Sequence, residues 1–431
     1  MAEDTRKVIN KLSEKMQQIR QDFHKYAEPG WLEFRTASLV ARKLTDLGYE
    51  IQVGREVIKA DERMGLPDPD EIKEAWERAH QEGGDVEFLK KMEGGLTGVV
   101  ATLKNGNGPS VGFRFDMDAL YVVESQSKDH RPAKKGFASI HEGIMHACGH
   151  DGHVALGLGL AEALPQLKDS FKGTVKLIFQ PAEEGVRGAK SMVAAGVVDD
   201  LDYVIGSHLY SGLETGKVVT GLSSGTATSK FDALITGSPA HAGGTPQSGK
   251  NALLAASTAV LNLYAIPRHA DGPTRINVGK LEAGTGRNVI CSLAKMLIET
   301  RGATIELNEY MVENAERILQ HAADMYSCDL EIKAMGAAPV ANSDPELVER
   351  VKDIIDQQEE FEVVIPEKGG GSEDFTYMMQ RVQSRGGQAL YLGFGADLGG
   401  WGHHTAEFDV DESALGKGLL VLILVLKDLL N

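Results

Sequence analysis

Several apolar segments of this chain are followed at once by side chains that can bind a metal or move a proton. The segment 110–115 runs into Asp116 and Asp118, the segment 174–179 into Glu183 and Glu184, and the segment 203–207 into His208. Short, continuous apolar runs of this kind predict buried strands. Because α/β folds gather their functional side chains at the carboxyl edge of such strands, the pattern predicts a sheet with one polar site at that edge.

The densest group of metal-capable side chains lies in residues 145–153. This stretch offers His146, Cys148, His150, Asp151 and His153. A thiolate with imidazoles suits zinc, and manganese becomes suitable when carboxylates join them. One turn cannot supply a complete ligand shell in good geometry, so we expect further ligands from the other strand ends. The alternatives are a His-rich surface turn and a Cys148 nucleophile activated by a nearby histidine.

Length and composition restrict the class of protein. A chain of 431 residues predicts two domains. The formal net charge of −17 argues against nucleic acid and anionic membranes as partners. The charged N-terminal segment predicts no secretory signal peptide, and three scattered cysteines favour the cytoplasm. The apolar run around 419–426 is too short to cross a bilayer and predicts a buried terminal helix.

The order of expected elements divides the chain. Segment 222–333 has the order β-α-β-β-α-β, which predicts an inserted domain of the ferredoxin-like type. Residues 1–221 and 334–431 then form the α/β domain that carries the site. Within it, the polar segment 55–95 predicts a helical insertion, with a mobile charged loop as the alternative for its first half.

Four motifs, in this order and spacing, resemble the dinuclear-metal amidohydrolases. They are Asp-Met-Asp-Ala-Leu at 116–120, Met-His-Ala-Cys-Gly-His-Asp-Gly-His at 145–153, Gln-Pro-Ala-Glu-Glu-Gly at 180–185 and Ser-Glu-Asp-Phe at 372–375. That group includes aminoacylases, hippurate hydrolases, carboxypeptidase G and indole-acetyl-amino acid hydrolases. The resemblance implies a metallopeptidase-type α/β domain, with a central mixed sheet flanked by helices. It also implies that the inserted domain closes over the site and dimerises.

The resemblance assigns roles to individual residues. The implied ligands of two divalent metal ions, manganese being favoured and zinc the alternative, are Cys148, His150, Glu184, His208 and His404. Glu183 becomes the general base. His241 and Asn288 lie on the inserted domain, from which His241 reaches the active site of the partner and stabilises the oxyanion there.

Three further residues follow from the chemistry of that site. Asp118 is expected to orient a ligand histidine, with a helix N-cap as the alternative. Arg287 and Arg301 are the cations expected to bind a substrate carboxylate, with surface ion pairs as the alternative. His24, Trp31 and Glu373 are further candidates for lining the pocket.

The expected function is metal-dependent hydrolysis of the amide bond of an aroyl- or acyl-amino acid. The preferred substrate is p-aminobenzoyl-glutamate, a folate breakdown product. Hippurate, indole-acetyl-amino acids and dipeptides are the alternatives, as is a non-catalytic subunit of the same fold. The expected assembly is a homodimer or a heterodimer with a related second chain.

Overall fold

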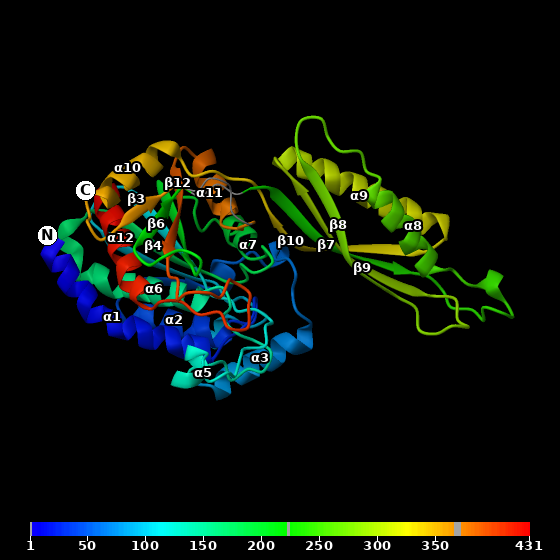
Figure 1. Cartoon of the computed structure of the whole chain (residues 1–431), viewed down its shortest axis with the longest axis horizontal. Coiled ribbons are helices and arrows are strands. Elements are labelled where there is room, and N and C mark those ends of the chain that lie inside the picture. The colour runs from blue at the N-terminus through cyan, green and yellow to red at the C-terminus, as the bar shows by residue number, and fades with distance from the viewer. Residues whose placement is uncertain (1, 222–224, 366–371) are drawn as a thin grey trace.

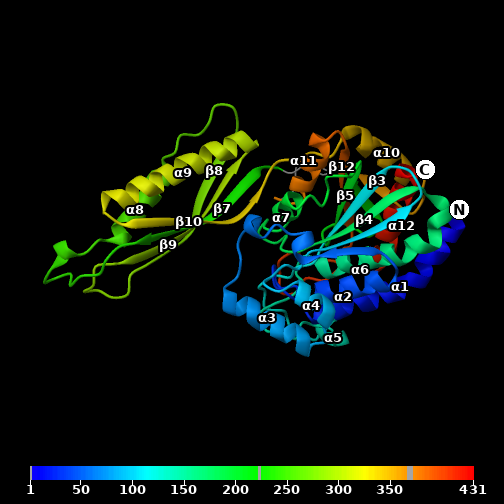
Figure 2. The same cartoon turned by 180° about the vertical axis from the view of Figure 1, so that it is seen from behind.

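The computed structural model describes residues 2–221, 225–365 and 372–431, which form two lobes (Figures 1 and 2). The larger lobe holds both termini, and the smaller lobe extends away from it. The expected domain boundary at residue 222 lies outside the described residues. The three glycines at 369–371, which directly precede the fourth motif, lie outside them as well.

The larger lobe is built on a mixed sheet of eight strands. They are β1 (Glu50–Val53), β2 (Val99–Asn105), β3 (Ser110–Asp116), β4 (Gly173–Gln180), β5 (Tyr203–Tyr210), β6 (Lys217–Thr220), β11 (Glu362–Val364) and β12 (Gln388–Gly395). Their order is β1-β2-β4-β3-β5-β12-β6-β11. The neighbours β4, β3, β5 and β12 are parallel, so their carboxyl ends meet at one edge, as expected from the sequence.

Helices cover both faces of this sheet. One face packs against α1 (Ala2–Lys25), α2 (Phe34–Asp46), α6 (His150–Ala163), α10 (Pro345–Asp356) and α12 (Ser413–Leu429), and the other against α7 (Ala189–Ala194) and α11 (Thr376–Ser384). Successive strand residues alternate between the two cores: Leu177 lies in the first and Ile178 in the second. The terminal helix α12 is largely buried, as predicted. No helix in the described ranges is long and apolar enough to cross a membrane.

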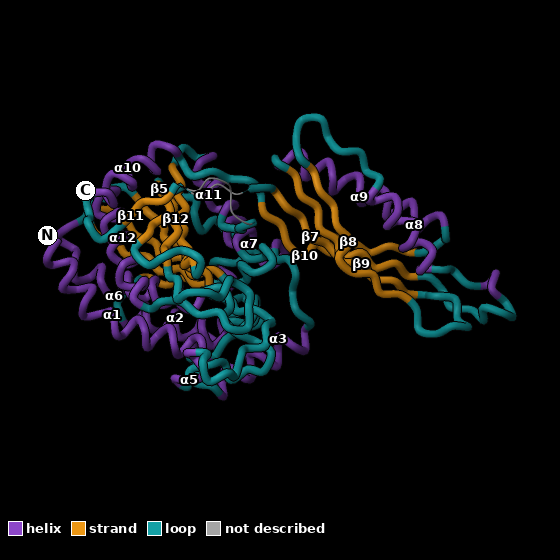
Figure 3. Tube along the Cα trace, viewed as in Figure 1, coloured by secondary structure: helices purple, strands orange, loops and turns teal. Residues whose placement is uncertain are grey.

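The smaller lobe is a four-stranded antiparallel sheet with two helices on one face (Figure 3). Its elements are β7 (Ala227–Thr236), α8 (Ala252–Tyr264), β8 (Thr274–Ala283), β9 (Leu293–Gly302), α9 (Ile305–Met325) and β10 (Asp329–Ala338). This is the predicted β-α-β-β-α-β order, with strands arranged β10-β7-β9-β8. Phe231, Ala233 and Ile235 pack in the core beneath the helices, so Lys230 and Asp232 face the opposite side.

The segment 55–95 is an ordered part of the larger lobe. It contains two short 3-10 helices at 54–56 and 60–62, followed by α3 (Pro69–Gln81) and α4 (Val86–Lys91). Val57 and Ile58 are buried in its second core, which excludes a mobile loop for this part. The backbone N–H of Gly65 donates to the carbonyl of Ala334 in β10 at 3.3 Å. The insertion therefore contacts the strand that returns from the smaller lobe.

The structure differs from the expected elements in two respects. His208 was expected just beyond a strand, but it lies inside β5, because the pairing of β5 with β12 continues to Tyr210. The strands β1, β6 and β11 and the helices α5 (Arg131–Lys135) and α7 were not predicted. Each has only three to six residues, which is too few for a periodic pattern to show.

Candidate active site

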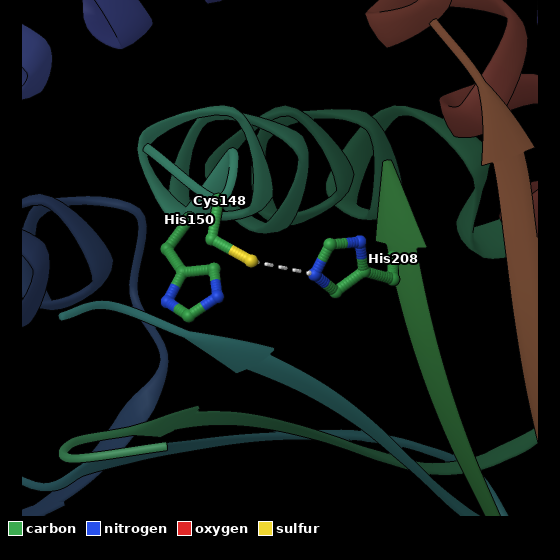
Figure 4. A group of neighbouring side chains, drawn as sticks. All are labelled: Cys148, His150 and His208. Atoms are coloured by element: carbon green, nitrogen blue, oxygen red, sulfur yellow. Dashed lines mark hydrogen bonds between the residues drawn. The ribbon is translucent and has the colours of Figure 1, made fainter. Parts of the chain in front are cut away.

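The cluster at 145–153 forms the turn into α6. Gly149 adopts φ 92°, a left-handed conformation that favours glycine. The chain turns there, so that Cys148 precedes the helix and His150 begins it. Figure 4 shows both side chains facing His208 from β5. The Sγ atom of Cys148 lies 3.5 Å from Nε2 of His208.

The five side chains expected to bind metal come together at the carboxyl edge of the sheet. Two groups of donor atoms, each lying within 4.8 Å of one another, are Cys148 with His150 and His208, and Cys148 with Glu184 and His404. Cys148 belongs to both groups. A third group joins Glu183 to His150 and Glu184. The arrangement therefore offers two adjacent ligand sets that share one thiol.

The donor atoms suit a divalent cation. His150 is completely buried, and its Nε2 has no hydrogen-bond partner among the described residues. Burial of an unpaired polar atom costs free energy that a bound ion would offset. Thiol, imidazole and carboxylate are the donors that zinc accepts, and manganese accepts the nitrogen and oxygen donors.

Asp118 holds two parts of this site together. Its Oδ1 lies 3.3 Å from Nδ1 of His150. The same carboxylate accepts hydrogen bonds from the backbone N–H groups of Glu183 at 3.0 Å and Glu184 at 2.9 Å. Asp118 therefore orients the imidazole of His150 and fixes the turn that carries both glutamates, while Nε2 of His150 stays free for a metal.

A second buried carboxylate, Asp116, was named with Asp118 after the apolar segment 110–115, but no individual role was assigned to it from the sequence. Its Oδ1 pairs with Nδ1 of His153 at 2.5 Å, and its Oδ2 pairs with Arg114. The other ring nitrogen of His153 accepts the backbone N–H of Leu209 at 2.9 Å. Both nitrogens of His153 are thus occupied, so this histidine supports the wall of the site and does not offer a ligand atom.

The turn after β4 is strained. Ala182 and Val186 both have positive φ, 53° and 62°, which is unusual for residues with a Cβ and most of all for a β-branched one. Glu183 and Glu184 lie between them. Burial, together with the carboxylates of Glu373 and Glu184, raises the pKa of Glu183 well above its usual range. A carboxyl group whose charged form is disfavoured in this way holds an accepted proton more firmly than a solvated glutamate does, as a general base that later returns the proton requires.

Glu183 and four of the expected ligands, Cys148, Glu184, His208 and His404, line a cleft of about 420 Å³ between the lobes. Its lining includes Arg301 from β9 and Glu373, and also three residues that the sequence did not single out: Lys230, Tyr210 and Tyr391. His24 and Trp31 do not line it. His24 is buried in an ion-pair network, and the indole of Trp31 donates to the carbonyl of Met64.

His241, Asn288 and Arg287 also lie outside this cleft. His241 follows the carboxyl end of β7, whereas Lys230, which lines the cleft, lies near the amino end of the same strand. The six residue steps from Lys230 to Thr236 alone span about 20 Å in an extended strand. The N–H of Ala242 donates to the carbonyl of Asn288 at 3.0 Å, so His241 and Asn288 lie in adjoining loops.

Comparison with known proteins identifies the family. The profile of peptidase family M20/M25/M40 matches residues 112–428. The chain belongs to this family. It is 49% identical to one of the chains of the p-aminobenzoyl-glutamate hydrolase of Escherichia coli (strain K12), over 96% of this chain and 95% of that protein. It is 48% identical to indole-3-acetyl-aspartic acid hydrolase of Enterobacter agglomerans, over 96% of each.

A solved structure is similar over the whole length. The crystal structure of an aminobenzoyl-glutamate utilization protein from Klebsiella pneumoniae matches with a TM-score of 0.85 and 43% identity, covering 97% of each chain. The expected resemblance to the amidohydrolase group is thus confirmed. As a member of the M20/M25/M40 family, this chain is a metal-dependent amidohydrolase with a central mixed sheet flanked by helices.

The position of Asp118 in this M20/M25/M40 site leads to a prediction. The change Asp118→Asn keeps the shape but replaces one oxygen that accepts hydrogen bonds by an NH₂ group that cannot. We expect the affinity for manganese to fall about 10–100-fold, the usual cost of losing the group that orients a ligand histidine. Calorimetric titration of the metal-free protein measures this. An unchanged affinity would contradict the orienting role.

A buried ion-pair network lies beneath the cluster at 145–153. Nδ1 of His24 pairs with Asp151 at 2.8 Å, and Nε2 pairs with Glu124 at 3.0 Å. Burial opposes the charged imidazole, but the hydrogen bonds to Asp151 and Glu124 raise the pKa of His24 to about 9. The protonated histidine is therefore part of the folded state at neutral pH.

This network predicts how stability depends on pH. Because the pKa of His24 rises from 6.5 to about 9 on folding, its contribution is fully present below pH 6.5 and is lost as pH rises through 9. The shift corresponds to about 3 kcal/mol. Urea unfolding at pH 6.5 and pH 9.5 measures the loss, and His24→Gln is expected to flatten that dependence. Parallel pH curves for the two proteins would refute this.

Proposed function

We propose that this chain hydrolyses the amide bond of an aroyl- or acyl-amino acid, with p-aminobenzoyl-glutamate as the substrate. The convergence of Glu183 with Cys148, Glu184, His208 and His404 in one cleft, with the donor atoms of the buried His150 grouped with theirs, carries the proposal. The relatives support the substrate class, since two of them are named for amides of glutamate and aspartate. Hippurate and indole-acetyl-amino acids are the alternative substrates.

Cys148, His150, Glu184, His208 and His404 would hold two divalent ions, manganese being favoured and zinc the alternative. The shared position of Cys148 in both donor groups supports two ions rather than one. Bound ions of this kind polarise the scissile carbonyl and lower the pKa of an attacking water. A Cys148 nucleophile is less consistent with the site, because burial raises the pKa of this thiol to about 12 and leaves it protonated without a metal.

Glu183 acts as the general base. Its raised pKa suits a carboxylate that takes a proton from water and then gives it to the leaving amine. Glu184 is the neighbouring ligand, and Asp118 fixes both residues through their backbone N–H groups. Arg301, in the cleft, binds the α-carboxylate of the amino acid, since a guanidinium can bind a carboxylate through two parallel hydrogen bonds.

The smaller lobe, residues 222–333 in the expected division, serves as the lid and the dimerisation domain. The helix α8 presents Leu254, Leu261 and Tyr264 to solvent, with Leu261 75% exposed. The strand β8 beside it is an edge of the sheet. An exposed apolar stripe next to an open strand edge is typical of a surface that a second protein chain covers. The partner is a second copy or a related chain.

In such a dimer, His241 and Asn288, with Arg287 close to them in sequence, would complete the active site of the partner. Their distance from the cleft of their own chain supports this role. His241 is exposed, and its Nδ1 accepts hydrogen bonds from the N–H groups of Gly243 and Gly244. Nε2 is then the protonated nitrogen, and it can donate to the oxyanion.

The dimer surface predicts the effect of a charged residue on α8. Leu261→Asp places a carboxylate in the apolar stripe, and we expect the assembly to dissociate to single chains at micromolar concentration. Light scattering after size-exclusion chromatography measures the mass. Leu293→Asp, at an exposed leucine on β9, is the matched control. A Leu261→Asp protein with the wild-type mass would exclude α8 from the interface.

A hydrolysis screen tests the function. The assembly that contains this chain is stripped of metal, reloaded with manganese or zinc and assayed on p-aminobenzoyl-glutamate, hippurate and indole-3-acetyl-aspartate. We expect the fastest turnover with p-aminobenzoyl-glutamate and manganese, and none without metal. Activity that survives complete metal removal would favour the Cys148 nucleophile. Absence of all hydrolysis in the reloaded assembly would leave a non-catalytic role for this chain.

A further inference from the structure

The charges of the cleft are divided between the two lobes. The larger lobe contributes the carboxylates of Glu183, Glu184 and Glu373, whereas the smaller lobe contributes two cations, Lys230 and Arg301. A substrate with two carboxylates would be repelled by the first set. Among the described residues that line the cleft, Lys230 and Arg301 are therefore the cations that can hold such a substrate beside the metal site.

The two cations are neighbours on one face of the small sheet. Strand pairing places Lys230 opposite Glu299 and Thr228 opposite Arg301. Lys230 and Arg301 are thus diagonal neighbours on the face that points away from α8 and α9. Side chains in this relation lie about 7–8 Å apart at their Cα atoms, a separation that can place their charged groups around one small dianion.

The partners of the two cations differ. Nε of Arg301 pairs with Glu299 at 2.5 Å, which fixes the guanidinium. Lys230 is half-buried, and its ammonium makes no ion pair or hydrogen bond within the described part of the chain. It lines the same cleft as His404 and Glu184. Lys230 thus combines an unsatisfied charge with proximity to the reacting centre.

We propose that Lys230 binds the side-chain carboxylate of the amino-acid half of the substrate and thereby selects acidic amino acids. The proposal rests on the amide hydrolysis proposed above and adds the residue that determines its specificity. Arg301, held by Glu299, takes the α-carboxylate that every acyl-amino acid has. Lys230 has a flexible stem and a point charge, so it adapts to side chains of different length. A neutral side chain leaves the ammonium unpaired, which disfavours that substrate.

The test compares two substrates that differ only in this charge. The manganese-loaded assembly is assayed with p-aminobenzoyl-glutamate and with p-aminobenzoyl-glutamine, which has the same shape and a neutral side chain. The variant is Lys230→Met, which keeps the apolar stem. The matched control is Lys333→Met on β10, because Lys333 is exposed, lies opposite Asp232 on the same sheet face and does not line the cleft. Melting temperatures check that both variants are folded.

We expect Lys230→Met to lower kcat/KM for the glutamate substrate about 10–100-fold, mainly through KM. For the glutamine substrate we expect a change of less than about threefold, and Lys333→Met should change neither. Equal losses on both substrates would overturn the proposal, as they would place Lys230 on a group common to both. A Lys230→Met variant that still prefers the glutamate substrate over the glutamine substrate as strongly as wild type would also overturn the proposal. A wild-type assembly that hydrolyses neither amide would refute the proposed function itself, and the role of Lys230 with it.

Discussion

Replacing Glu183 with glutamine is expected to lower kcat by about 10²–10⁴-fold, the range for loss of a general acid–base group. Glutamine has nearly the same size and can still accept a hydrogen bond, but it cannot take a proton from water. The backbone N–H of residue 183 still donates to Asp118, so the turn is retained. The reason for a large effect is that one carboxyl group serves two successive proton transfers.

The measurement must separate proton transfer from metal binding. Steady-state kinetics with p-aminobenzoyl-glutamate give kcat, and elemental analysis of the same sample gives the metal content. In Glu183→Gln we expect the wild-type metal content and a KM within about threefold of wild type. The matched change Glu184→Gln, one residue further along, is expected to lose metal and activity together. Wild-type turnover in Glu183→Gln would exclude it as the base.

Much of the larger lobe follows from local sequence. The segments 110–115 and 174–179 are continuous apolar runs, as strands buried on both faces require, and both became central parallel strands. Parallel neighbours bring their carboxyl ends to one edge. The carboxylates and the histidine after such runs, among them Asp118, Glu184 and His208, were therefore predicted to meet. The family resemblance added Cys148 to this set. The short edge strands, such as β11, carried no comparable signal because three residues show no period.

The support of the site depends on tertiary packing. The sequence grouped His153 with the metal-capable residues. In the fold, β3 and β5 lie next to α6, so that Asp116 and the backbone N–H of Leu209 occupy the two ring nitrogens of His153. Lys230 gave no signal in the sequence either. A lysine in an alternating strand is ordinarily a solvated residue, and its place in the cleft depends on how the smaller lobe sits on the larger one.

Removing the charge of Arg20 is expected to destabilise the larger lobe by about 3–5 kcal/mol, the usual cost of leaving buried charges without a partner. Arg20 lies on α1, and its side chain is 0% exposed. It pairs with Asp151 at 2.9 Å, Asp409 at 2.7 Å and Glu412 at 3.3 Å. These contacts join α1 to the start of α6, where His150 lies, and to the approach to α12.

In Arg20→Met the apolar stem keeps its packing, but the three carboxylates lose their common cation. Within the described ranges, His24 and Arg131 remain as their charged partners. The surface arginine Arg42 is the matched control: it also pairs with two carboxylates, Asp85 and Glu87, but is 35% exposed. Solvent and salt screen such pairs, so Arg42→Met should cost less than about 1 kcal/mol.

Urea unfolding followed by tryptophan fluorescence reports on the larger lobe, because all three tryptophans of the chain, at positions 31, 76 and 401, belong to it. Equal losses in the two variants would show that Arg20 contributes no more than a surface pair. A selective loss would show that the wall of the metal site depends on a charge on the first helix.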